Sequence, residues 1–131
     1  MRRALITALA ALMTCGLLLA GGVPPARAAT DSVTVAGSLQ SELGCPGDWQ
    51  PDCAATHLAQ VAGTDTWRGS FPVPAGAYEF KIAINDSWTV NYGTGGALDG
   101  PNIPLGLGGD AQLVFSFDAT THQVAVVPEK L

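Results

Sequence analysis

The sequence predicts an all-β fold, an immunoglobulin-like antiparallel β-sandwich with one short disulfide-closed loop. Three observations lead to this fold class. Several short segments alternate apolar and polar side chains with a period of two, turn-forming residues separate them, and no segment after residue 28 has the periodicity of a long helix. Six or seven short strands joined by turns within about 100 residues are typical of such a sandwich.

The period-two pattern recurs in six segments. In 77–85 it is clearest, because four large apolar residues fall on one face and Glu79 and Lys81 on the other. Trp67 is in phase with Phe71, so we expect it in the core. The six predicted strand segments are 32–37, 66–73, 77–85, 88–93, 111–118 and 122–127.

The residues between these segments agree with short connections. Residues 73–76, Val-Pro-Ala-Gly, have the signature of a type I turn, and residues 118–121 can close a hairpin between the last two strands. The glycine- and proline-rich residues 93–109 predict an extended surface loop. Residues 38–44 are expected to form a single helical turn before the first cysteine of the mature chain.

Residues 1–28 are predicted to be a secretory signal peptide, with a basic start, an apolar run and a cleavage site that we place after Ala28. The apolar run is too short for a stable membrane anchor. Cys15 suggests a lipoprotein signal as a rival, but the apolar run continues past it, which disfavours lipidation. We therefore expect residues 29–131 to form one secreted, extracellular domain that stands free of any hydrolase domain.

The charge of the predicted mature chain excludes two classes of partner. Removing residues 1–28 leaves Arg68, Lys81 and Lys130 as the cations against 11 Asp and Glu residues, a net charge of about −8. Nucleic acids and anionic membranes both bind proteins through clustered cations. We expect a monomer that binds neither.

The stretch CPGDWQPDC is the loop that we expect a disulfide to close. Cys45 and Cys53 would pair in an oxidising compartment. Because the bond limits the conformations of the unfolded chain, it would stabilise the fold by roughly 2.5 kcal/mol. Two prolines stiffen the loop around Trp49. This tryptophan is either an exposed anchor for a partner or a plug that folds back over the edge of the sandwich.

The sequence has no recognisable catalytic or metal-binding motif. His57 and His122 are far apart in the pattern of strands, and no nucleophile elbow, zinc motif or calcium-binding loop is present. A pair of acidic residues of the glycosidase type is the alternative that inventory alone leaves open. We expect no enzymatic activity and no cofactor.

The sequence around Trp88 is typical of a sugar-binding surface. A flat aromatic ring can pack on the C–H face of a pyranose while amide, carboxylate and ammonium groups bond the hydroxyls. The alternative is that Trp88, Val90 and Tyr92, which share a face under period two, lie on a buried edge strand. The neighbouring hydrogen-bonding candidates are Asn85, Asp86, Asn91 and Lys81.

Three stretches of this sequence resemble a known family. "GSLQSELGCPGDWQPDCAATHL" (37–58), "VPAGAYEFKIAINDSWTVNYG" (73–93) and "NIPL" (102–105) look like the small immunoglobulin-like module of bacterial pullulanases and amylopullulanases. The resemblance runs from Val33 to about Val126. It implies a non-catalytic β-sandwich associated with α-glucans such as starch, glycogen or pullulan.

By the same resemblance, five residues are candidates for carbohydrate binding: Lys81, Trp88, Asn91, Tyr92 and, less directly, Trp49. The leading hypothesis is therefore that the protein binds an α-glucan polysaccharide or a maltooligosaccharide, mainly by stacking on Trp88. A second hypothesis is that it docks on a secreted glycosidase or inhibits it, using the Trp49 loop as a rigid interface anchor. A third is a purely structural secreted sandwich.

Overall fold

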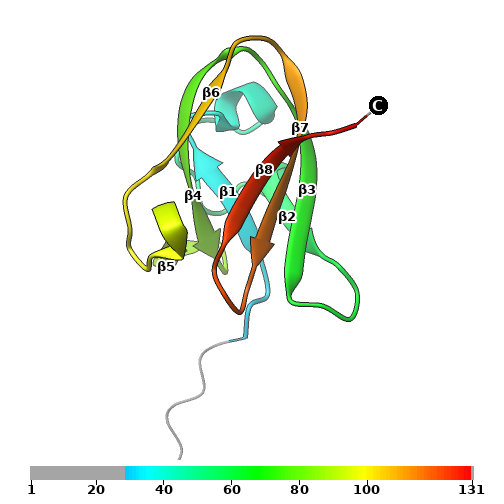
Figure 1. Ribbon diagram of the computed structural model, residues 1–131. Helices are drawn as coiled ribbons and strands as arrows, with labels where there is room; N and C mark the ends of the chain where they lie inside the picture. Colours follow the sequence, from blue (N-terminus) through cyan, green and yellow to red (C-terminus); the bar gives the residue numbers. More distant parts are fainter. Residues whose placement is uncertain (1–28, 131) are drawn as a thin grey trace, which may run out of the picture.

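The computed structural model describes residues 29–130, which form eight strands and three short 3₁₀ helices (Figure 1). The predicted signal peptide and its cleavage site lie outside these residues. None of the helices in the described part is long and apolar enough to cross a membrane. The elements in chain order are β1 (Val33–Gly37), η1 (Gln40–Leu43), η2 (Ala54–Thr56), β2 (His57–Gln60), β3 (Thr66–Val73), β4 (Gly76–Ile84), β5 (Ser87–Tyr92), η3 (Thr94–Gly96), β6 (Ile103–Leu107), β7 (Ala111–Asp118) and β8 (Val124–Pro128).

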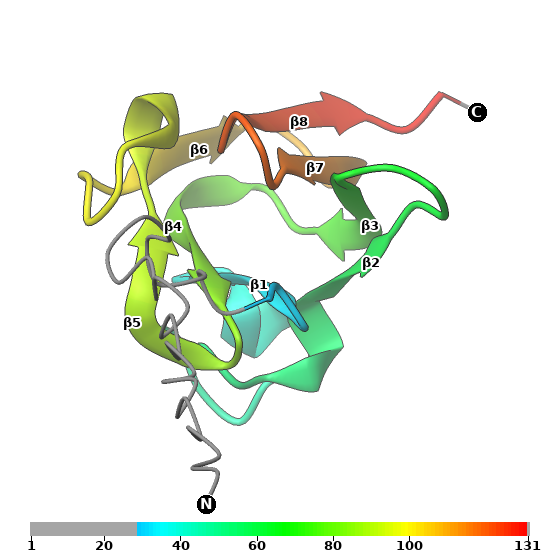
Figure 2. The same cartoon turned by 90° about the horizontal axis from the view of Figure 1, so that it is seen from below.

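All of the strand pairs are antiparallel, and they join into one curled sheet. The strand order is β5-β4-β1-β2-β3-β7-β8, and β6 pairs with the N-terminal half of β4 on the edge that β5 occupies further along. Seen from below, the sheet curls so that β1, β4 and β5 face β3, β7 and β8 across the core (Figure 2). The immunoglobulin-like antiparallel β-sandwich predicted from the sequence is confirmed.

The core contains the residues that alternation placed on the inner faces. Phe80, Phe115 and Phe117 are each at most 1% exposed, and the rings of Phe80 and Phe115 meet edge to face at 5.4 Å. Trp67 is 7% exposed, as its phase predicted. Burying a large apolar side chain contributes about 1.5–3 kcal/mol, so these residues account for much of the stability of the fold.

Two strands were not predicted from the sequence. β2 is short and mostly exposed, and its sequence HLAQ gives little alternation. β6 lies within residues 93–109, so the prediction that this whole stretch is loop is wrong. Ile103, Leu105 and Leu107 alternate with Pro104 and Gly106, and all five pair with β4. Proline is tolerated there because β6 is an edge strand.

The expected turns are confirmed in position. η1 falls within residues 38–44, and the β7–β8 hairpin turns at residues 119–123. In that hairpin the Asp118 carboxylate accepts hydrogen bonds from the backbone N–H groups of Thr121 and Thr120, at 3.0 and 2.8 Å. These bonds hold the pKa of Asp118 below its ordinary value.

Candidate functional site

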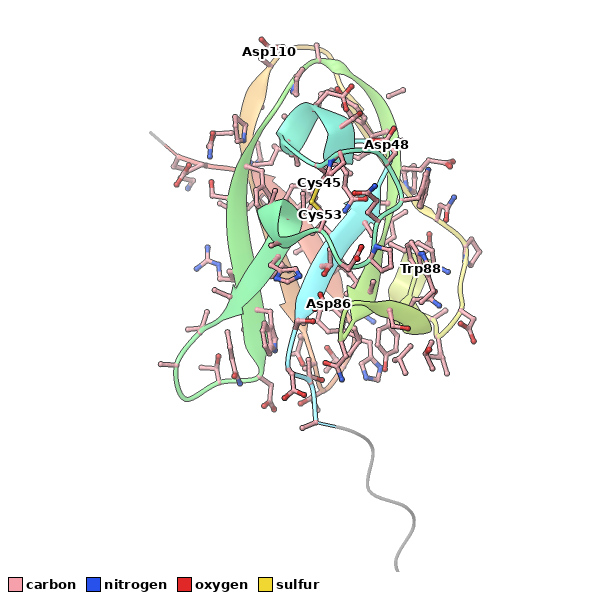
Figure 3. All side chains as sticks on the ribbon, turned by 180° about the vertical axis from the view of Figure 1, so that it is seen from behind. Cys45, Asp48, Cys53, Asp86, Trp88 and Asp110 are labelled. Carbon is pink, nitrogen blue, oxygen red and sulfur yellow. A yellow bond between two sulfur atoms is a disulfide. The ribbon has the colours of Figure 1, made fainter. Side chains whose placement is uncertain are left out.

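The disulfide-closed loop covers the outer face of β1 and β4. Cys45 and Cys53 are bonded, as expected, and Figure 3 shows the bond on this face of the molecule. All five residues of β1 are buried, which means that the loop side of the strand is covered as well as the core side. The backbone N–H of Trp49 donates to the carbonyl oxygen of Gly37 at the end of β1, at 3.2 Å.

A single buried amide fixes this loop to the sheet. Gln40, in η1, has no exposed surface. Its Oε1 accepts from the backbone N–H groups of Gln50 (2.7 Å) and Gly37 (3.2 Å). Its Nε2 donates to the carbonyl oxygen of Gln50 (2.8 Å) and to the Thr56 hydroxyl (3.0 Å). The loop is thus held from within by four hydrogen bonds as well as by its disulfide.

Trp49 has a backbone conformation that few side chains adopt. Its φ angle is +57°, in the left-handed region, where a residue other than glycine costs free energy. The bonds of Gln50 and the disulfide on either side hold the tip of the loop in this conformation. The side chain of Trp49 is half-buried in this conformation.

Trp88 lies in a bulged segment of the neighbouring edge strand β5, residues 88–90, which we call the excursion. Ser87 pairs with Ile84, but the next residue of β4, Ala83, pairs with Asn91. Residues 88–90 therefore have no partner on β4, and all three are exposed. Trp88 and Val90 each keep 37% of their surface in contact with solvent.

The odd length of this excursion corrects the predicted alternation. Three residues of β5 are inserted between two consecutive pairs of the ladder with β4. Because this number is odd, the side chains that follow residues 88–90 point to the opposite face of the sheet from the one that strict alternation predicts. Tyr92 accordingly turns into the core, 5% exposed, and packs against the rings of Phe117 (5.6 Å) and His122 (4.1 Å). Trp88 and Tyr92 do not share a face.

The loop and the excursion meet at their tryptophans. The ring centroids of Trp49 and Trp88 are 6.4 Å apart, and their planes are inclined by 41°. We call these two side chains the tryptophan pair. Figure 3 labels Trp88 on the same view of the molecule that shows the disulfide loop. Sequence reasoning named both residues but did not predict that they are neighbours, because no local pattern reports a contact between residues 39 positions apart.

Asn91 holds the excursion in place. Only 6% of this residue is exposed, and its Nδ2 donates to the carbonyl oxygen of Trp88 at 2.9 Å and to Asp99 Oδ1 at 2.8 Å. Asp99 in turn donates its backbone N–H to the carbonyl oxygen of Asn91, at 3.0 Å. Trp88 is thereby tied to the glycine-rich segment that follows β5.

Asn85 and Asp86 form the two-residue turn that leads into the excursion. Both have φ of +56°, as a type I′ hairpin requires. The Asn85 side chain accepts from the backbone N–H groups of Asp31 and Ser32 and donates to the carbonyl oxygen of Ala29, so it is occupied in holding the N-terminal segment. Asp86 lies 2.7 Å from His57 Nε2 and is about half exposed.

Lys81, the remaining sequence candidate, lies on the outer face of β4. It is partly buried and pairs with Ala36 of β1, two residues along β4 from Ala83. Trp49 is bonded to the next residue of β1, so Lys81 lies beside the strand segment that the loop covers. Lys81 is the cation among the candidate residues, and it lies on the same face as the loop that carries Trp49.

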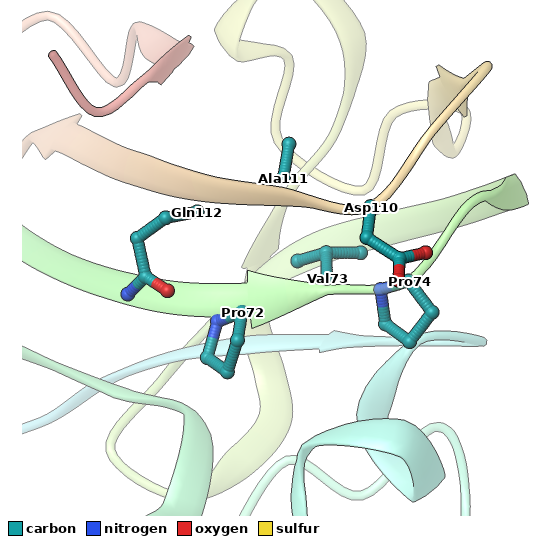
Figure 4. A pocket seen from close by; sticks show the side chains of 6 residues that line it. All are labelled: Pro72, Val73, Pro74, Asp110, Ala111 and Gln112. Atoms are coloured by element: carbon teal, nitrogen blue, oxygen red, sulfur yellow. The ribbon is translucent and has the colours of Figure 1, made fainter. Parts of the chain in front are cut away.

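A second, shallow hollow lies away from the tryptophan pair, and it is less suited to a ligand than the surface around the pair. About 300 Å³ in volume, it lies between the end of β3 and the start of β7, as Figure 4 shows. The Asp110 carboxylate accepts from the backbone N–H of Ala75 at 2.8 Å and so closes the local turn. The lining residues are Pro72, Val73, Pro74, Asp110, Ala111 and Gln112.

The described residues contain no cluster of three or more His, Cys, Asp or Glu side chains that could hold a metal ion. What the fold and the tryptophan pair define is a small β-sandwich module with an aromatic surface site. The model of the Pullulanase X25 domain matches residues 32–124, and the chain belongs to this family. The resemblance inferred from the sequence is confirmed.

Individual relatives agree with this assignment. The chain is 33% identical over 88 residues to an amylopullulanase of Thermoanaerobacter thermohydrosulfuricus, a match covering 67% of this chain and 6% of the relative. An amylopullulanase of Thermoanaerobacterium thermosulfurigenes is 32% identical over 88 residues, covering 67% and 5%. The solved pullulanase from Bacillus acidopullulyticus superimposes with a TM-score of 0.64 at 30% identity, over 72% of this chain and 11% of that one. The chain thus spans only a small part of these relatives.

Proposed function

We propose that this protein is a secreted, non-catalytic module that binds α-glucan through the tryptophan pair. The observation that carries the proposal is that Trp49 and Trp88, from segments far apart in sequence, lie 6.4 Å apart on one face of the sandwich. Trp88 leaves more than a third of its surface in solvent, although a ring of this size gains free energy from burial. A ligand with apolar faces would provide that burial.

The geometry of the pair suits a chain of sugar rings. Each indole can pack on the C–H face of a pyranose, and an inclination of 41° gives the two rings an angled rather than a flat surface. Consecutive rings of an α-glucan also lie at an angle to one another. Lys81 would donate to hydroxyl groups from the outer face of β4, and Asp86 would accept from them at the turn before Trp88.

The other candidates support the site without touching the sugar. Asn91 and Tyr92 are buried, and Asn85 has its amide engaged with the N-terminal segment. We assign Asn91 the positioning of Trp88, Tyr92 the packing beneath β5, and Asn85 the turn. Membership of the Pullulanase X25 domain family supports a glucan-related setting, and the disulfide supports an oxidising, extracellular one.

Affinity electrophoresis through gels containing starch, glycogen or pullulan tests the proposal. We expect the protein to be retarded by at least one of the three, and Trp88→Ala to weaken binding about tenfold or more, or about 1.4 kcal/mol. Val127→Ala is a matched control, because Val127 is 52% exposed on β8, away from the pair. Absence of retardation in all three gels, or equal binding by wild type and Trp88→Ala, contradicts the proposal.

The alternative, docking on a secreted amylolytic enzyme, uses the same surface. It is favoured by the relatives, in which the matching segment belongs to a much longer pullulanase chain. Co-purification with an amylase, or loss of amylase activity when the protein is added, would support it. A protein that binds starch and leaves amylase activity unchanged supports glucan binding instead.

A further inference from the structure

The curled sheet does not close, and a cavity lies where its two ends face each other. β5 is at one end of the strand order and β8 at the other, with no hydrogen bonds between them in the described residues. The core side chains bridge this gap, with Tyr92 of β5 against Phe117 of β7 at 5.6 Å. Beside that contact a cavity of about 550 Å³ opens between β5 and the β7–β8 turn. We call it the end cavity.

The end cavity has an apolar base and an apolar rim. Its base is formed by Ile84, Tyr92 and Phe117, all of which are less than 10% exposed. Its rim includes Val90 and Leu98, which are 37% and 54% exposed and are among the few large apolar side chains that face solvent. The remaining lining residues are Thr30, Asn85, Ser87, Thr89, Ala119 and His122.

The polar side chains that line the cavity carry hydroxyl, amide and imidazole groups. No Asp, Glu, Lys or Arg side chain lines it, although acidic residues outnumber basic ones in the sequence. The hydroxyl groups of Ser87 and Thr89 are 2.9 Å apart and bonded to each other on the β5 wall. On the opposite wall the His122 ring is stacked on Tyr92 at 4.1 Å, with 14° between the planes. A ligand that carries a full charge would lose its hydration here without gaining a carboxylate, ammonium or guanidinium partner.

We propose that the end cavity binds a small, uncharged molecule with a flat apolar or aromatic body. Its volume falls within the range of about 300–1,000 Å³ that small-molecule sites occupy, and its lining has the usual composition of such sites, apolar surface with a few hydroxyl groups. The imidazole ring of His122, backed by the Tyr92 ring on which it is stacked, provides a flat surface for a planar ligand, and the hydroxyls of β5 can orient one polar edge.

This site is separate from the glucan site, although both use β5. The tryptophan pair lies on the outer face, which the disulfide loop covers, whereas the cavity lies between β5 and the β7–β8 hairpin. The proposal therefore does not rest on glucan binding, and each site can be removed without the other.

Titration with N-phenyl-1-naphthylamine, a neutral dye that fluoresces in apolar surroundings, tests the proposal. We expect saturable enhancement with a stoichiometry of one. Ala119→Trp should abolish it by filling the cavity from the β7–β8 turn. Leu98→Glu, a change at an exposed position that the fold tolerates, should weaken it several-fold by placing a carboxylate on the rim. Thermal melting of both variants shows whether they fold.

Trp88→Ala serves as the control that separates the two sites. We expect it to weaken starch binding about tenfold and to keep dye binding, whereas Leu98→Glu should keep starch binding and weaken dye binding several-fold. The absence of saturable enhancement, equal enhancement in wild type and both cavity variants, or loss of enhancement in Trp88→Ala alone overturns the proposal. Displacement of the dye by maltoheptaose would overturn the assigned class of ligand, since it would make the cavity a glucan site.

Discussion

Replacing Gln40 by leucine removes the amide that holds the disulfide loop to the sheet. The side chain is fully buried and makes four hydrogen bonds, to Gly37, to both backbone groups of Gln50 and to Thr56. Leucine has a similar size but makes none of these bonds, so four buried or part-buried groups each lose a hydrogen-bond partner. At about 1 kcal/mol for each bond, we expect the free energy of unfolding to fall by about 4 kcal/mol.

Equilibrium unfolding in urea measures this loss. Because the native surface changes little, the midpoint should fall while the dependence on urea stays the same. Gln60→Leu is the matched control, since Gln60 is exposed and its amide makes one hydrogen bond, to the carbonyl oxygen of Thr64. We expect that variant to change the free energy of unfolding by no more than about 0.5 kcal/mol. A loss below about 1 kcal/mol in Gln40→Leu, or equal losses in the two variants, would refute the assigned role of the buried amide.

Three further predictions follow from the described contacts. In a double-mutant cycle, Trp49→Ala and Trp88→Ala should show a coupling of about 0.5–1.5 kcal/mol in the free energy of unfolding, and additive effects would show that the rings do not interact in solution. Asn91→Asp should lower the melting temperature, because a carboxylate replaces the amide that donates to the Trp88 carbonyl and to Asp99; an unchanged melting temperature would contradict this bond pattern. The pKa of Asp118 is lowered in the folded state, so its contribution to stability is present above the ordinary value of 3.8 and is lost as the pH falls through the folded-state pKa. Asp118→Asn should therefore reduce the loss of stability that the protein shows as the pH falls in this acidic range. The same loss in wild type and variant would rule the contribution out.

Much of the fold could be predicted because each long strand carries its own signal. The alternation in 77–85 and 111–118 reflects one buried and one less buried face, and both segments are strands in the structure. β2 was missed because four mostly exposed residues give no pattern. β6 was missed because the glycines and prolines around it outweigh its three alternating aliphatic residues.

The candidate site was predictable only in part. Trp88 stood out as an aromatic residue among polar ones, but its partner did not, because the contact with Trp49 depends on how two distant segments fold onto one face. The supporting role of Gln40 gave no sequence signal, since a glutamine in a helical turn is ordinarily exposed. Period two failed at β5, because alternation holds only while every residue has a partner on the next strand.

The three unpaired residues of β5 contribute to the surface of this protein but not to the strand pairing that defines its fold. Since residues 88–90 and the tip of the disulfide loop contribute no ladder hydrogen bonds between strands, their length and composition can change while the pairings on either side stay in register. The same sandwich can therefore present different side chains at this place without a change in its strand pairing. Grafting another three-residue segment between Ser87 and Asn91 offers a direct route to proteins with new recognition properties.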